Sequence, residues 1–144
     1  EAEAPDYLKD ALIQANAVQD HLTNNFKTGR TGNESLRMAI ADSKAAGLRP
    51  QIYTHPLGLF GHSAGTTFGM WDAQKGVPGS GDHPLYENTV YAIELNAKVY
   101  LEEWGKDIRV MLEEPGFYGP DGFRYVNGRQ TELLLIGSKT PHLE

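Results

Sequence analysis

The sequence contains no cysteine, which excludes disulfide bonds, thiolate metal ligands and a thiol nucleophile. It has no excess of positive charge either, because 13 Lys and Arg against 19 Asp and Glu leave a formal net charge of −6. That balance disfavours nucleic acid as a partner. Long hydrophobic runs are also missing, since the longest, residues 133–137, is far shorter than the roughly 20 residues of a membrane helix. We therefore expect neither a nucleic-acid nor a membrane partner, while both a cytoplasmic and a secreted location stay open.

What is present is the composition of a folded domain, with 40% hydrophobic and 22% charged residues. A chain of 144 residues suffices for one domain that buries roughly 70% of its unfolded surface. We predict a single domain over 1–144 with its main body in 5–136. Residues 1–4, Glu-Ala-Glu-Ala, resemble the remnant of a yeast secretion leader, and 137–144 is expected to be a tail.

The first third of the chain predicts two helices. From Pro5 to about Lys27, apolar residues recur at spacings of three and four. A second helix is expected to begin at Thr31, which forms a Thr-x-x-Glu capping box with Glu34, and to end at Gly47. Its predicted inner face consists of Leu36, Ala39, Ile40 and Ala46.

Beyond residue 50 the apolar period changes to two, which indicates strands. The predicted strands are 51–55, 66–71, 89–101, 108–112, 123–126 and 132–136. Because helices come first and strands follow, the order favours an α+β fold, with two N-terminal helices packed on one curved antiparallel sheet.

A carboxylate interrupts the most apolar of these strands. Tyr91, Ile93 and Leu95 alternate with Glu94, which therefore points to the opposite face. Burying an ionised carboxylate is costly unless a cation or hydrogen bonds compensate for it. The alternative is an edge strand with Glu94 in water, and alternation allows both readings equally.

The strand near residue 110 repeats the pattern. Glu113 alternates with Leu112 and ends the run, so a second carboxylate could lie on the same face. The alternative is a solvated polar face on which Arg109 forms an ion pair. We expect the neighbouring acids Glu102, Glu103 and Glu114 to be solvated.

A serine nucleophile is disfavoured, although Ser63 lies in a Gly-x-Ser-x-Gly run. That motif requires a following helix. Residues 66–68, Thr-Thr-Phe, favour a strand instead.

The sequence contains, in this order, the four segments "YTHPLGLFGHSAGTTFGMWD", "LYENTVYAIELN", "IRVMLEEPGFY" and "GRQTELLLI". Together they resemble the signature of the pita-bread metallopeptidases. The resemblance covers nearly all of residues 5–136 and is closest to aminopeptidase P and prolidase, which cleave next to proline. It implies that His62, Glu94 and Glu113 are metal ligands. It also implies catalytic roles for His55 and Glu113, with His55 and Trp71 lining a peptide-binding pocket.

A histidine with two carboxylates suits Mn²⁺, Co²⁺, Fe²⁺ or Zn²⁺. The sequence departs from the family in the other ligands. The family uses two further aspartates on strands before the first helix, and Asp6, Asp10 and Asp20 lie on that helix instead. Gly69 stands where a second histidine follows, seven residues after His62.

Either Glu113 or Glu114 could be the third ligand, and alternation opposite Leu112 favours Glu113. We therefore expect a metal-dependent peptidase-like domain of the Xaa-Pro aminopeptidase or prolidase type that lacks the upstream aspartates. The alternative is a non-catalytic truncated or remnant domain that binds a peptide or protein, or that oligomerises. In either case we expect a homo-oligomer, because missing neighbouring strands leave a sheet edge open.

Overall fold

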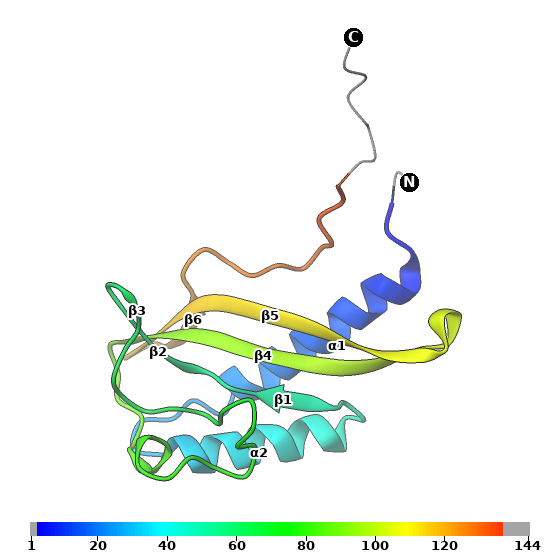
Figure 1. Cartoon of the computed structure of the whole chain (residues 1–144). Helices are drawn as coiled ribbons and strands as arrows, with labels where there is room; N and C mark the ends of the chain where they lie inside the picture. The colour runs from blue at the N-terminus through cyan, green and yellow to red at the C-terminus, as the bar shows by residue number, and fades with distance from the viewer. Residues whose placement is uncertain (1–2, 137–144) are drawn as a thin grey trace.

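A computed structural model describes residues 3–136 of the chain. The predicted tail 137–144 lies outside the described residues, as do the first two residues of the 1–4 segment. Two helices pack on an antiparallel sheet, as predicted (Figure 1). The helices are α1 (Asp6–Thr23) and α2 (Gly32–Ala45), and the strands are β1 (Pro50–Ile52), β2 (His55–Gly58), β3 (Gly61–His62), β4 (Thr89–Leu101), β5 (Lys106–Gly119) and β6 (Gly122–Tyr125). Within the described residues, no helix is long and apolar enough to cross a membrane.

Both predicted helices form, although α1 ends at Thr23, before the expected end near Lys27. The capping box of α2 is present: the Glu34 amide donates to Thr31 Oγ1 at 3.1 Å, and the Thr31 amide donates to Glu34 Oε2 at 2.8 Å. That backbone hydrogen bond holds the pKa of Glu34 below its usual value. The expectation for the inner face is wrong at Ala46, which is exposed beyond the end of the helix, whereas Ser43 is buried.

The sheet has the order β3-β2-β4-β5-β6, and β1 also pairs with β4. The predicted strand 89–101 is confirmed to the residue as β4. The predicted strand 51–55 is split in two, because Thr54 forms an isolated bridge to Phe68. The predicted strand 66–71 forms only isolated bridges, since Gly65 and Gly69 take positive φ angles that break an extended run. Residues 132–136 form no strand either: the preceding segment is held against α1, and the chain leaves the sheet there.

The core lies between the helices and one face of the sheet. Apolar residues of β4 pack there against both helices, and Tyr91, Ile93 and Leu95 are almost completely buried. Phe26, which follows α1, stacks on Phe68 with a centroid distance of 4.8 Å. The opposite face of β4 and β5 therefore remains available for polar side chains.

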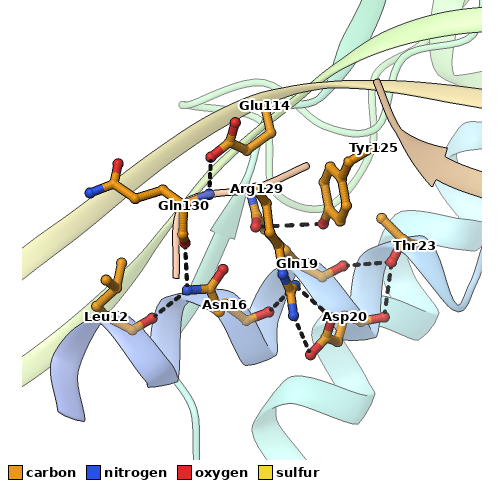
Figure 2. A network of polar contacts seen from close by, with 9 residues as sticks. All are labelled: Leu12, Asn16, Gln19, Asp20, Thr23, Glu114, Tyr125, Arg129 and Gln130. Carbon is orange, nitrogen blue, oxygen red and sulfur yellow. Dashed lines mark hydrogen bonds and ion pairs between the residues drawn. The ribbon is translucent and has the colours of Figure 1, made fainter. Parts of the chain in front are cut away.

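The segment after β6 is fastened to α1 by polar contacts (Figure 2). Arg129 donates from Nη1 to Asp20 Oδ1 at 2.6 Å and to the Asn16 carbonyl at 3.2 Å. Asn16 Nδ2 in turn donates to the Gln130 carbonyl at 3.0 Å, and the Gln130 amide donates to Glu114 Oε1 at 2.8 Å. These contacts fix residues 129–130 between α1 and β5.

The β4–β5 hairpin is the longest paired unit of the sheet. Its register runs from Thr89 opposite Tyr118 to Leu101 opposite Lys106. The turn between the strands includes Gly105 at φ 61°, a left-handed conformation that glycine adopts without a steric penalty. This register determines which side chains of β4 and β5 meet on the open face.

Candidate metal centre

Two carboxylates meet in the middle of the β4–β5 hairpin. Glu94 of β4 lies directly opposite Glu113 of β5. Glu94 is half-buried, with 32% of its side chain exposed, and Glu113 is more exposed. Like charges in directly opposed positions destabilise a sheet unless something compensates for their repulsion.

His55 of β2 brings an imidazole to this pair. The register sets His55 opposite Ala92, two residues before Glu94. Its Nδ1 lies 2.9 Å from the Pro56 carbonyl oxygen, which can only accept, so Nδ1 carries the donated proton. Its Nε2 lies 3.4 Å from Glu94 Oε2. That nitrogen is buried and has no hydrogen-bond partner among the described residues.

One ligand atom from each of His55, Glu94 and Glu113 lies within 4.8 Å of the other two. With Nδ1 protonated, the neutral imidazole presents a lone pair at Nε2, and ionised carboxylates only accept. While the imidazole is neutral, three acceptors converge with no donor among them, an arrangement that either a metal ion or a proton on Nε2 satisfies. A backbone carbonyl that fixes the tautomer of a ligating histidine is also a common companion of protein metal sites.

A pocket of about 390 Å³ opens beside this group. Both residues expected in the substrate pocket, His55 and Trp71, line it, together with Met70 and Tyr53. The loop that carries Trp71 is attached to the sheet, because Gln51 Nε2 donates to the Trp71 carbonyl at 2.5 Å. The pocket therefore offers aromatic and thioether surface next to the carboxylates.

No protein-family model matches the chain, and no curated protein matches its sequence. Among solved structures, the chain is similar to an X-Pro aminopeptidase from Thermotoga maritima, with a TM-score of 0.61 and 20% sequence identity. The similarity covers 93% of this chain and 35% of that one, so this chain spans about a third of the length of its neighbour. The likeness shows the fold.

The structure places His62 differently from the ligand role that the resemblance implies. His62 lies on β3, opposite Leu57, and is exposed. Its ring stacks on His55 with a centroid distance of 4.0 Å and an interplanar angle of 18°. The group formed with Glu94 and Glu113 contains His55, and His62 forms the outer layer of the pocket beside it.

The structure distinguishes Glu113 from Glu114. Glu114 accepts the Gln130 amide on the α1 side of the sheet (Figure 2). Glu113 points to the other face, toward Glu94. Glu113 is thus the member of the group, as alternation opposite Leu112 favours.

Gly69 has a geometric reason to be glycine. Its φ is +75°, and a Cβ at this position would lie 2.4 Å from the Ile52 carbonyl oxygen. A side chain, and therefore a histidine, does not fit this backbone. The position seven residues after His62 therefore cannot carry the second histidine that the family resemblance implies.

Ser63 lies on the β2–β3 hairpin, where its amide donates to the Pro56 carbonyl at 3.0 Å. Residues 64–68 form no helix, so the nucleophile-elbow context is absent around it. The sequence alone does not predict that His55 joins Glu94 and Glu113, because strand pairing cannot be read from it. A usable signal existed: Gln51, Tyr53 and His55 alternate with buried Ile52 and Thr54.

Proposed function

We propose that this chain is a partial pita-bread domain of the Xaa-Pro aminopeptidase or prolidase type, in which His55, Glu94 and Glu113 hold a divalent transition-metal ion. The observation that carries the proposal is His55 Nε2, a buried nitrogen without a hydrogen-bond partner that faces two carboxylates. Its ligand set of one nitrogen and two oxygen donors suits Mn²⁺, Co²⁺, Fe²⁺ or Zn²⁺. The fold of the X-Pro aminopeptidase neighbour supports the class.

Each residue has a part in this function. When bound, the ion supplies Lewis acidity and a water of lowered pKa. The Pro56 carbonyl holds the tautomer that leaves His55 Nε2 free to ligate. Glu113, the more exposed carboxylate, accepts the proton of an attacking water. Trp71 and the stacked His62 line the pocket in which we place a peptide.

Three ligands make a weak site. The family resemblance implies two aspartates before the first helix, and the aspartates of α1, Asp6, Asp10 and Asp20, do not belong to the group. We expect a single ion to bind weakly to the chain. Peptidase activity is expected only where another segment or chain supplies the two missing carboxylates.

Thermal melting with added Mn²⁺, Co²⁺ or Zn²⁺ tests the proposal. An ion at 100 times its Kd should stabilise the fold by about 2.7 kcal/mol. His55→Ala should remove most of this gain, because it deletes the nitrogen ligand. His62→Ala and Glu102→Ala should keep it, since neither residue belongs to the group. The metal proposal is wrong if no ion raises the melting temperature. If His62→Ala alone removes the gain, His62 is the ligand.

A second candidate function, self-association, rests on the edge of β5. Within residues 3–136, β6 pairs only with 116–119 of β5, so Lys106–Glu114 has no strand on its outer side. Open edges of this kind pair with other chains. We propose a second copy as the occupant, in an antiparallel pairing of two β5 strands centred on Met111. This arrangement would serve an oligomerising module even without catalysis.

A further inference from the structure

A second pocket, of about 330 Å³, lies farther along the same region of the sheet and differs sharply in charge from the metal group. Four cations line it: Lys44, Arg49, Lys98 and Arg109. They are four of the 13 Lys and Arg in a chain whose net charge is −6. We call this the basic pocket.

One carboxylate partly balances these cations. Asp107 accepts from Arg49 Nη2 at 2.6 Å and lies 3.0 Å from Lys98 Nζ. The hydrogen bond from Arg49, followed by that from Lys98, lowers the pKa of Asp107 to about 2, so the carboxylate stays ionised. Among the described residues, no carboxylate lies within ion-pair distance of Lys44 or Arg109. The basic pocket thus keeps a positive charge that can bind an anion.

Side-chain hydrogen bonds link the basic pocket to the metal group. Glu94, Asn96 and Lys98 alternate along β4 and share one face. Asn96 Nδ2 donates to Gln51 Oε1 at 2.8 Å and to the Tyr53 hydroxyl at 3.2 Å. Gln51 and Asn96 line the basic pocket, and Tyr53 and Glu94 line the pocket beside the metal group. A polar bridge therefore joins the two sites.

The opposing strand repeats this arrangement. On β5, Arg109 lies opposite Lys98, and Glu113 lies opposite Glu94. The face thus carries carboxylates at one position and cations four residues away, about 13 Å along the strands. An extended peptide spans such a distance with about four residues.

We infer that the basic pocket binds the free α-carboxylate of a short peptide whose other end lies at the His55–Glu94–Glu113 group. Arg109 is the main contact, because its guanidinium has no carboxylate partner in the described chain and can grip a carboxylate with two parallel hydrogen bonds. Asp107 orients the side chains of Arg49 and Lys98 through its two ion pairs. This inference rests on the proposed peptidase-like function and adds a substrate class: peptides of about four residues with a free C-terminus.

The test compares the tetrapeptide Ala-Pro-Ala-Ala as a free acid and as its C-terminal amide, with the dipeptide Ala-Pro as a length control. Binding to the full chain is measured by calorimetry with and without Mn²⁺. The acid should bind at least about tenfold more tightly than the amide, a ratio typical of a hydrogen bond to a charged group. Arg109→Gln should abolish this preference. Arg124→Gln, on β6 and outside the basic pocket, should preserve it. Mn²⁺ should tighten the binding of the tetrapeptide acid and of its amide alike. The ratio of their two affinities should therefore stay the same.

The two hypotheses fail in different ways. Equal binding of acid and amide, or an acid preference that survives Arg109→Gln, overturns the inference. Because Arg109→Gln leaves the three ligands intact, its Mn²⁺-induced melting shift should equal that of the parent protein. A parent protein that shows no melting shift with any ion but still prefers the acid would instead refute the metal proposal alone.

Discussion

Glu94 and Glu113 lie directly opposite each other on neighbouring strands, with His55 Nε2 3.4 Å from the Glu94 carboxylate. Two carboxylates in this position repel one another, and the imidazole offers only a lone pair between them. We expect this repulsion to lower the stability of the hairpin when neither a metal ion nor a proton on His55 Nε2 compensates for it.

Replacing Glu113 with glutamine should separate the two contributions. Without metal, Glu113→Gln should raise the free energy of unfolding by about 0.5 kcal/mol, because it removes the repulsion of an opposed like-charge pair. With Mn²⁺, the variant should gain much less stability than the parent. Denaturant unfolding in EDTA and in Mn²⁺ measures both effects. Glu102→Gln, outside the group, should change neither, and a destabilised apo Glu113→Gln would show that Glu113 already has a favourable partner.

The backbone at Gly69 should tolerate no side chain. Gly69→Ala should lower the free energy of unfolding by more than about 3 kcal/mol, because its Cβ would meet the Ile52 carbonyl oxygen at 2.4 Å. Gly29→Ala is the matched control: φ is +83° there, but no atom lies within 4 Å of the added Cβ. Its cost should stay near 1 kcal/mol, from backbone strain alone. Equal costs in the two variants would mean that the loop moves freely away from Ile52.

The ion pairs of Asp107 should make stability depend on pH. Arg49 and Lys98 lower the folded-state pKa of Asp107 to about 2, whereas its unfolded value is about 3.9. A depressed pKa contributes stability above the unfolded value, and the contribution is lost as pH falls through the folded value. Asp107→Asn should therefore be less stable than the parent at pH 7, and the difference should shrink from about pH 4 toward pH 2.

Urea unfolding across this range measures that difference. Carbon-detected NMR titration of the Asp107 carboxyl checks its cause directly. The exposed Asp72 is not part of the pair, so Asp72→Asn serves as the control. A gap between parent and Asp107→Asn that stays constant from pH 7 to pH 2 would contradict the electrostatic explanation.

Sedimentation should reveal self-association through β5. The parent protein should form dimers as its concentration rises, and Met111→Lys should shift it toward monomer, because lysine on an open edge opposes strand pairing. Met111 is 66% exposed. Met38→Lys, at a 40% exposed site on α2, should leave the dimer unchanged. Only monomer at high concentration would count against the edge as an interface.

Local signals in the sequence were enough for most of the fold. The capping box at Thr31 and the alternation through Glu94 depend on near neighbours, so both the start of α2 and the bounds of β4 could be predicted. The candidate site depends on pairings between distant residues. His55 reaches Glu94 because β2 pairs with β4, and no local pattern shows that His55 lies closer to it than His62. The run 66–71 has the composition of a strand, yet glycines on either side of Phe68 keep it to isolated bridges.

The turn at Gly105 has an influence well beyond its surroundings. The turn begins after Leu101, which lies seven residues past Glu94 on β4, roughly 23 Å along the strand. One residue inserted into or deleted from this turn would slide β5 along β4, so that Leu112 or Glu114 would take the position opposite Glu94. The same shift would carry Arg109 away from Lys98. Loop length at a site that touches neither pocket thus decides whether both pockets exist, and we expect this turn to tolerate changes of residue far better than changes of length.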